Sequence, residues 1–181
     1  MKGKSVMDQT LSNFPLTLES NDPWFTETDK DLLKRKEILL AEIPQKKYKN
    51  VLDIGCGNGL ITRDLPGEKI LGIDNSKSAV SLAANNINSK VSFKCLSIYN
   101  IPQIKNDKYD LIVLSGLMYP HYIKESLYLI YCIIDQHLSD TGILITNHID
   151  KWYKARFPFL MVKEYYYEHL GYTTRIEVYT K

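Results

Sequence analysis

Three glycines at alternate positions, Gly55, Gly57 and Gly59, directly follow the short apolar run Val51-Leu52-Asp53-Ile54. The run indicates a buried β-strand. Glycine is needed where φ is positive, or where a Cβ would block a ligand that lies against the backbone. A helix from about residue 60 to 65 would then offer free N–H groups and a positive dipole end to an anionic group. We therefore predict a strand, a ligand-binding loop and a helix in succession.

The rest of the chain alternates between short apolar runs and helical periodicity. Strands are expected at 51–54, 70–73, 91–96, 109–114, 143–146 and 173–179. Helices are expected at about 31–43, 76–87 and 123–138, with a last helix ending near residue 170. Strands of near-continuous apolar residues that alternate with helices are typical of a parallel sheet covered on both faces. This predicts an α/β fold, a doubly wound and mostly parallel sheet in three αβα layers.

The polar N-terminal segment, with Pro15 and Pro23, differs from the apolar remainder. We predict that residues 1–27 form an arm and residues 28–181 a single domain, since 181 residues with 44% hydrophobic content suit one core. Within the arm, Trp24 and Phe25 are adjacent aromatics. They are interpreted either as a lid over a bound ligand or as a hydrophobic anchor for the arm.

Charge and cysteine content exclude several classes of function. The net charge is only +2, and the densest basic cluster, Lys34-Arg35-Lys36, reads as a solvated helix face, so no nucleic-acid partner is expected. Cys56, Cys95 and Cys132 form no CxxC pair and lie in apolar runs, which predicts small buried hydrophobes and no metal site. The chain shows no signal peptide and no apolar run of about 20 residues. We expect a cytoplasmic protein with no membrane association.

The spacing of the loop and a later acid narrow the ligand. A dinucleotide fingerprint is GxGxxG, but here the third glycine comes one residue early and Leu60 follows, which disfavours NAD and FAD. Asp74 ends the second expected strand, where an acid usually accepts hydrogen bonds from ribose hydroxyls. The alternative for Asp74 is a helix N-cap. Asp53 either contacts the ligand or only braces the loop backbone.

These motifs resemble those of class I S-adenosylmethionine (SAM)-dependent methyltransferases. Residues 51–59 are similar to the first motif, Ile73-Asp74 to the second and Tyr109-Asp110-Leu111-Ile112-Val113 to the fourth-strand motif. Residues 138–144 match the "L-x-P-G-G" turn before the fifth strand, without its proline and one glycine. The resemblance covers roughly residues 45–148. It implies a Rossmann-like fold, a methyltransferase, SAM as cofactor and S-adenosylhomocysteine (SAH) as product.

The resemblance also assigns cofactor contacts by position. The glycines would hold the amino-acid end of SAM and Asp74 the ribose, while Ser97 replaces the usual acid near the adenine and Ile98 packs on the ring. The full set of expected cofactor contacts is Trp24, Asp53, Gly55, Cys56, Gly57, Asn58, Gly59, Asp74, Asn75, Ser97, Ile98 and Ser115.

A narrower resemblance is to the nodulation protein S group of N-methyltransferases, which act on an amino sugar. It rests on Asp22-Pro23-Trp24 and on the stretch from Leu114 to Tyr119, where Gly116 replaces the usual glutamate. The chain lacks the [DNS]PP[YFW] stretch and the Pro-Cys nucleophile of DNA-methylating enzymes. We therefore predict methyl transfer to N or O of a small molecule, with an amino sugar or other carbohydrate preferred.

Candidate catalytic residues follow the fourth expected strand. His121 could act as a general base near neutral pH, or could cap the next helix or face solvent. Tyr119 could shape the acceptor pocket or contact SAM, or could simply pack. His148 and Asp150, after the fifth expected strand, are further candidates for a base. The alternative to an enzyme is a SAM-binding sensor or scaffold without catalysis.

The C-terminal part leaves two alternatives for completing the sheet. Methyltransferases of this class usually end with two antiparallel strands, but only about one strand's length follows Gly171. Either the last strand is missing, or residues 157–163 belong to the sheet rather than to a helix. Tyr165-Tyr166-Tyr167 is expected on that helix, with side chains in three directions. The oligomeric state is expected to be a monomer or a homodimer.

Overall fold

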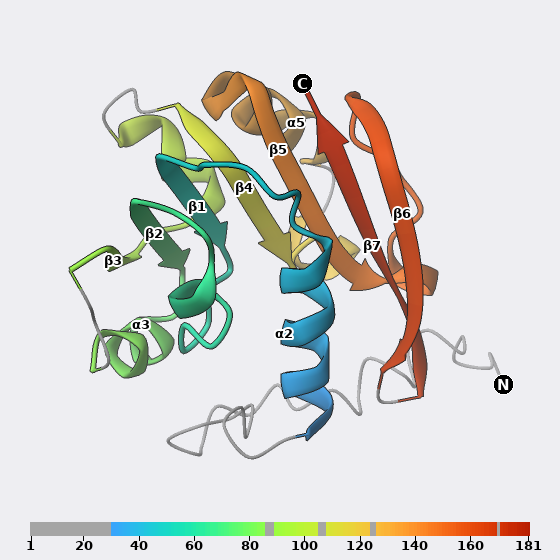
Figure 1. Cartoon of the computed structure of the whole chain (residues 1–181), viewed down its shortest axis with the longest axis horizontal. Helices are drawn as coiled ribbons and strands as arrows, with labels where there is room; N and C mark the ends of the chain where they lie inside the picture. The colour runs from blue at the N-terminus through green and yellow to red at the C-terminus, as the bar shows by residue number, and fades with distance from the viewer. Residues whose placement is uncertain (1–29, 86–88, 105–107, 124–125, 170) are drawn as a thin grey trace, which may run out of the picture.

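A computed structural model describes residues 30–85, 89–104, 108–123, 126–169 and 171–181, without the side chains of Asp31 and His121. The predicted arm of residues 1–27, with Trp24 and Phe25, lies outside these residues. The described strands are β1 (Asn50–Ile54), β2 (Lys69–Asp74), β3 (Val91–Cys95), β4 (Tyr109–Ser115), β5 (Leu138–Ile149), β6 (Leu160–His169) and β7 (Tyr172–Thr180). They form one seven-stranded sheet in the order β3-β2-β1-β4-β5-β7-β6 (Figure 1).

The first five strands are parallel, and the last two are antiparallel. β1 lies in the interior of the sheet, where Leu52 is opposite Leu71 of β2 and Ile112 of β4. β3 pairs with β2 and β5 with β4, while β7 pairs antiparallel with both β5 and β6. Because parallel strands end at the same edge of a sheet, the loops after β1 to β5 meet there.

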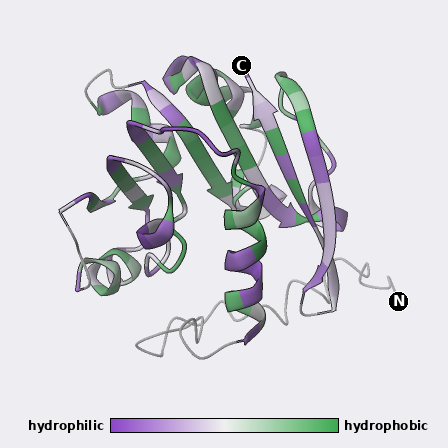
Figure 2. Cartoon of the chain, in the orientation of Figure 1, coloured by the Kyte–Doolittle hydropathy of each residue, from purple (hydrophilic) through white to green (hydrophobic). Residues whose placement is uncertain are grey.

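Helices cover both faces of the sheet because the strand residues alternate between two cores. Leu52 and Ile54 share one core with α5 (Leu127–His137), whereas Val51 shares the other with α2 (Lys30–Glu42). In Figure 1, α2 lies in front of the sheet and α5 behind it, and Figure 2 shows the central strands as mostly hydrophobic. α3 (Lys77–Ala84) packs against β2 and β3. The predicted three-layer doubly wound fold is confirmed. No helix in the described ranges has the length and apolar character needed to cross a bilayer.

Two of the predicted helices are wrong in extent. The helix expected at residues 60–65 is a single 3-10 turn, Thr62–Asp64. Pro66 follows and disfavours helical angles at Leu65, whose ψ is 141°. The helix dipole expected after the glycine loop is therefore absent. The long helix expected at 123–138 is described as two pieces, the short α4 (Pro120–Ile123) and α5.

The C-terminal helix expected before residue 170 is wrong, because β6 occupies residues 160–169 and pairs along β7. The alternative in which residues 157–163 join the sheet is right for 160–163, and the strand continues beyond them. The three tyrosines thus alternate between two faces of a strand instead of fanning around a helix. Tyr167 is buried, whereas Tyr165 and Tyr166 are exposed.

Two smaller expectations also differ from the structure. The turn expected at residues 140–142 lies within β5. The pairing of β5 with β4 is irregular there: Leu138 is opposite Tyr109, and Ile143 is opposite Leu111. Cys56 is buried as predicted, but Cys95 and Cys132 are exposed. Cys95 ends β3, the strand at one edge of the sheet, which leaves its surroundings open on that side.

Candidate active site

A cavity of about 540 Å³ opens at the carboxyl edge of the sheet, within the usual size range of small-molecule sites. Among the residues singled out from the sequence, those that line it include Asp53, Gly55, Cys56, Gly57, Asn58, Asp74, Asn75, Ser97, Ile98, Ser115, Tyr119 and His148. Gly59 is not part of the wall, because a Cβ there would meet the Phe93 ring at 2.6 Å. Trp24 and the side chain of His121 lie outside the described residues.

The glycine loop bends around the end of β2. The backbone N–H groups of Gly55 and Cys56 both donate to the carbonyl oxygen of Ile73, at 2.8 and 3.0 Å. Gly55 and Gly57 have φ values of +79° and +54°, which other residues rarely adopt. A Cβ at Gly57 would have no described heavy atom within 4 Å, whereas one at Gly55 would be 2.8 Å from Leu117. The loop therefore leaves open space directly against its backbone at Gly57.

Asp74 connects this loop to the start of α3. Its Oδ2 accepts a hydrogen bond from the Gly57 N–H at 3.0 Å, and its Oδ1 accepts one from the Ser76 N–H at 2.8 Å. Ser76, rather than Asp74, is the N-cap of α3, since the Ser76 hydroxyl accepts from the Ala79 N–H. The carboxylate thus lies in the cavity wall and is held from both sides.

Asp53 lies beneath the loop, with only 2% of its surface exposed. The Thr62 hydroxyl donates to its Oδ2 at 2.6 Å, so the carboxyl braces the 3-10 turn that follows the loop. Burial raises the pKa of Asp53 to about 6, although the Thr62 hydrogen bond acts in the opposite direction. Of the two roles expected for Asp53, the bracing contact is the one made by its side chain here.

The wall after β3 is formed by Ser97, Ile98 and Tyr99. Ser97 is the N-cap of the 3-10 helix Ile98–Gln103, and its hydroxyl accepts from the Tyr99 N–H at 3.4 Å. The Leu96 N–H donates to the carbonyl oxygen of Asp74 at 2.8 Å, which ties this segment to the end of β2. The position expected to face an adenine therefore carries a hydroxyl and an apolar side chain beside Asp74.

Arg35 is a cavity residue that the sequence did not indicate. It belongs to the basic cluster interpreted as a solvated face, but its side chain lines the cavity and its Nη2 donates to the Ser115 hydroxyl. Lys34 is exposed as expected, and Lys36 pairs with Asp64. Among the described residues, Arg35 forms no ion pair. The cavity therefore contains a guanidinium without a carboxylate partner from the described chain.

Tyr119 lines the opposite part of the cavity, together with Tyr172 of β7. Its hydroxyl oxygen accepts a hydrogen bond from the Ile149 N–H at 3.0 Å, after β5. Burial raises the pKa of Tyr119, so its hydroxyl stays protonated near neutral pH. Tyr119 can therefore shape this side of the cavity, but it is a poor general base.

His148 and Asp150, considered as bases after β5, are committed to other contacts. Burial, and next the charge of Arg175, lower the pKa of His148 to about 3, and its Nε2 is 2.9 Å from Arg175 Nη2. The hydrogen bond from Lys154, opposed by partial desolvation and helped by Arg175, keeps the pKa of Asp150 below its usual value. Both groups are too weakly basic to remove a proton near neutral pH.

Comparisons with known proteins agree with this geometry. A family model described as a methyltransferase domain matches residues 45–171. The ribosomal protein L11 methyltransferase of Desulfotalea psychrophila is 30% identical over 116 residues, which are 60% of this chain and 37% of that protein. The ubiquinone biosynthesis O-methyltransferase of Nitrosococcus oceani is 31% identical over 81 residues, 40% of this chain and 34% of that protein. The chain thus spans about a third of the length of these curated relatives.

A solved structure resembles the chain over nearly its whole length. The N-methyltransferase NodS from Bradyrhizobium japonicum WM9, in complex with SAH, superposes with a TM-score of 0.73. The match covers 96% of this chain and 97% of that one at 18% sequence identity. At this identity the likeness establishes a shared fold.

Proposed function

Because this chain belongs to the family of methyltransferase domains, matched over residues 45–171, we propose that it transfers the methyl group of SAM to a small-molecule acceptor. SAM is the cofactor, and it supplies a methyl group already activated on a sulfonium. One observation carries the proposal: a single cavity extends from the glycine loop and Asp74 to Tyr119 and Tyr172. A shared cavity holds cofactor and acceptor in contact and limits water, as methyl transfer requires.

The cavity residues fit the parts of SAM. The open backbone at Gly57 and the guanidinium of Arg35 would hold the amino-acid end, because Arg35 lacks a carboxylate partner in the described chain. Asp74, with Asn75 beside it, would accept hydrogen bonds from the ribose hydroxyls. Ser97 and Ile98 would contact the adenine.

The charges in the cavity support a neutral acceptor. Of the described residues that line it, only Asp53 and Asp74 are acids, and both accept hydrogen bonds near the glycine loop. In the described part of the wall, a protonated amine beside Tyr119 and Tyr172 would meet no carboxylate. We therefore infer that the acceptor binds as a neutral amine or a hydroxyl compound, which includes an amino sugar in its free-base form. A neutral amine needs no general base, whereas His121 is the remaining candidate base for a hydroxyl.

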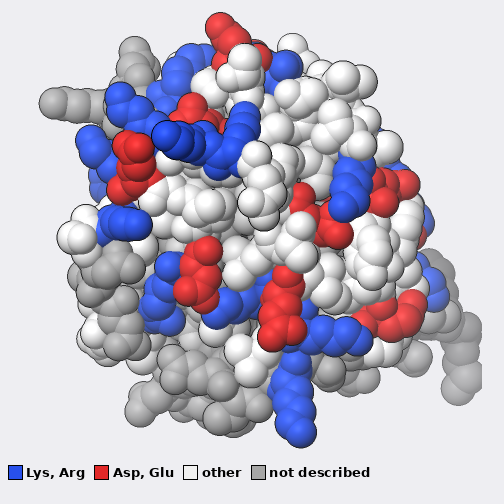
Figure 3. Space-filling model, in the orientation of Figure 1, with Lys and Arg blue, Asp and Glu red and all other residues white. Residues whose placement is uncertain are grey.

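The experiment must distinguish the small-molecule acceptor from a macromolecular acceptor, and an enzyme from a protein that only binds SAM. One relative is named for a ribosomal protein, but the face of this chain in Figure 3 carries interspersed basic and acidic side chains rather than one basic surface. A SAM-binding sensor would share the cofactor contacts but would transfer no methyl group. The arm of residues 1–27, the single domain over 28–181, the cytoplasmic location and the monomer or homodimer stay predictions from the sequence.

The test combines binding and turnover. Calorimetric titration with SAM and SAH is expected to give micromolar affinity that falls about 10- to 100-fold in Asp74→Ala, because hydrogen bonds to a charged group are lost. Asp135→Ala, an exposed acid that pairs with Lys181, is the matched control. SAH release is then measured with a panel of amines, amino sugars and phenols, and with ribosomes. No SAH release from any acceptor would favour the sensor, and methylated ribosomal protein would contradict the small-molecule proposal.

A further inference from the structure

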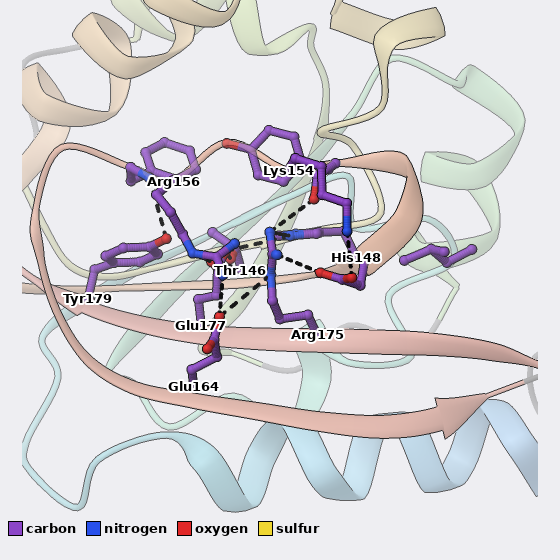
Figure 4. A network of polar contacts seen from close by, with 12 residues as sticks. Thr146, His148, Lys154, Arg156, Glu164, Arg175, Glu177 and Tyr179 are labelled. Atoms are coloured by element: carbon purple, nitrogen blue, oxygen red, sulfur yellow. Dashed lines mark hydrogen bonds and ion pairs between the residues drawn. The ribbon is translucent and has the colours of Figure 1, made fainter.

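A group of charged and polar side chains is buried on the α5 face of the sheet, and it reaches the cavity at His148, which lines the wall. Its centre is Arg175 of β7, whose side chain is 2% exposed (Figure 4). The guanidinium donates through Nη1 to Asp150 Oδ1 at 2.6 Å and through Nη2 to the carbonyl oxygen of Tyr153 at 3.0 Å. The same Nη2 is 2.9 Å from Nε2 of His148. One side chain therefore contacts the end of β5 and both ends of the segment 150–153 that follows it.

The buried carboxylate of Glu177 fixes the position of the Arg175 guanidinium. Glu177 of β7 is 0% exposed, and its Oε1 lies 3.3 Å from Nε of Arg175. The Thr146 hydroxyl donates to Oε2 of Glu177 at 2.9 Å. A buried charge is tolerated only when it is paired and hydrogen-bonded, so Arg175 cannot leave this place without a large energetic cost. The imidazole of His148 is neutral at physiological pH, and its Nε2 accepts from the guanidinium, since an arginine can only donate.

The loop that Arg175 contacts packs behind the part of the cavity wall that contains Tyr119 and Tyr172. It contains the 3-10 helix η3 (Asp150–Trp152), which directly follows β5. Before η3, the Ile149 N–H donates to the Tyr119 hydroxyl. At its end, the Trp152 ring packs edge-on against Tyr119, with centroids 5.2 Å apart, and lies 5.4 Å from the Tyr172 ring. Tyr119 and Tyr172 both line the cavity, on the side assigned to the acceptor.

We propose that Arg175 is a positioning residue for the acceptor side of the cavity: by holding Asp150 and Tyr153 it fixes the loop that places Tyr119 and Trp152. This inference rests on the proposed function for the meaning of the acceptor side. Arg175 is not among the described residues that line the cavity, and the glycine loop and Asp74 follow other strands. Loss of its contacts should therefore disturb Trp152 and leave cofactor binding nearly unchanged.

Arg156 provides a matched control in the same group of charges. Its Nε lies 2.9 Å from Oε1 of Glu177 and its guanidinium also pairs with Glu164, whereas it is the guanidinium of Arg175 that donates to Asp150 and to the carbonyl oxygen of Tyr153. Replacing Arg156 removes a guanidinium from the same carboxylate and leaves the hydrogen bonds of Arg175 to Asp150 and Tyr153 in place. Lysine cannot replace Arg175, because one ammonium cannot reproduce a planar fork that reaches Asp150, Tyr153, His148 and Glu177 together.

The experiment uses the full chain labelled with 5-fluorotryptophan, in which Trp152→Phe assigns the Trp152 fluorine resonance. We expect that resonance to shift or broaden in Arg175→Lys and in Asp150→Asn, but to keep its position in Arg156→Met. Lys154→Met controls for loss of the exposed pair between Lys154 and Asp150. Calorimetry on the same variants is expected to give SAH affinities within about twofold of the original protein, since distant sites act nearly independently.

The outcomes separate this proposal from the proposed function. An unchanged Trp152 resonance in folded Arg175→Lys and Asp150→Asn overturns the positioning role. A fall in SAH affinity that parallels the change at Trp152 also overturns it, because Arg175 would then support the whole fold. If Arg175→Lys does not fold, Asp150→Asn decides, since it takes the charge out of the contact between Arg175 and the loop, and Lys154→Met accounts for the pair of Asp150 with Lys154. If the unmodified protein binds no SAH, the proposed function fails, while the Trp152 resonance still tests whether Arg175 positions the loop.

Discussion

At the scale of single residues, Arg35 is expected to contact the amino-acid end of the cofactor and not its nucleoside end. We predict that Arg35→Met weakens SAH binding by about 10- to 100-fold, because the carboxylate at the amino-acid end of SAH loses its hydrogen bonds to the guanidinium. Binding of 5′-methylthioadenosine, which lacks the amino-acid end, should change little. Calorimetric titration of both ligands with the variant measures this difference.

The control for this prediction is the neighbouring Lys34→Met, which removes an equal charge from an exposed position on α2. Lys34→Met is expected to bind both ligands as the unmodified protein does. Equal losses for SAH and 5′-methylthioadenosine in Arg35→Met would mean that Arg35 supports the cavity as a whole and does not contact the carboxylate.

The buried carboxyl of Asp53 predicts a specific pH dependence of stability. Its pKa is about 6 in the folded protein against an ordinary value of 3.8, chiefly because burial disfavours the charge. The folded chain therefore binds the extra proton between about pH 4 and 6, and this stabilisation is lost as the pH rises through 6. A difference of about two pKa units corresponds to ~3 kcal/mol. Urea unfolding should show a fall of that order for the unmodified protein relative to Asp53→Asn.

The comparison uses the difference between the two proteins at each pH, which removes the contributions of other titrating groups. Asparagine keeps an oxygen that can accept from the Thr62 hydroxyl but carries no charge. Parallel stability curves for the two proteins between pH 4 and 7 would show that Asp53 titrates at its ordinary pKa.

These residues also show what the sequence can reveal. Asp74 and Gly57 were predictable because their positions depend on a short loop and on the end of the next strand, both visible as local spacing. Arg35 was not, because its contact with Ser115 joins positions 80 residues apart and depends on how α2 packs across the sheet. The pattern around Arg35 is simply that of a basic helix face, and no local signal separates it from Lys34.

At the scale of elements, β6 predicts unequal roles for three consecutive tyrosines. Tyr167 is buried, and its hydroxyl both accepts from Nδ2 of Asn147 at 3.2 Å and can donate to Oδ1 at 3.3 Å. Tyr167→Phe leaves that buried amide with fewer partners, which should cost about 1–3 kcal/mol. Tyr165→Phe, at an exposed position on the same strand, should change the free energy of unfolding by less than about 0.5 kcal/mol. Urea unfolding of the two variants makes the comparison, and similar losses would contradict the strand geometry.

The elements that were mispredicted share a physical cause. β6 is an edge strand with apolar residues such as Leu160 and Val162 facing outward, so it lacks the alternation that marks a half-buried strand. Its pairing with β7 decides its structure, and that pairing is not local. The interior strands were predictable because both of their faces are buried, which requires continuous apolar runs. The prediction of a helix after the glycine loop was wrong because Pro66 leaves room for only one turn before β2.

At the scale of the whole molecule, the cavity joins parts of the chain that lie far apart in sequence. Its walls come from α2, from the segments after β1 to β4, from α3, from the end of β5 and from β7. Both cores contribute to the cavity wall, since Ile54 belongs to one core and Ile61 packs against the other. A ligand bound there contacts most layers of the fold at once, so its binding energy should stabilise the molecule as one unit.

Thermal unfolding tests that conclusion. SAH at about 100 times its dissociation constant should add ~2.7 kcal/mol, which raises the Tm by roughly 5–11 °C for a chain of this size. In Asp74→Ala at the same SAH concentration the rise should fall to less than about half, because the added stability depends on the ratio of ligand concentration to Kd. NAD⁺ should give no rise, since the glycine spacing disfavours dinucleotides. A rise with NAD⁺, or equal rises with SAH in both proteins, would mean that the cavity recognises its ligand by other contacts than those at Asp74.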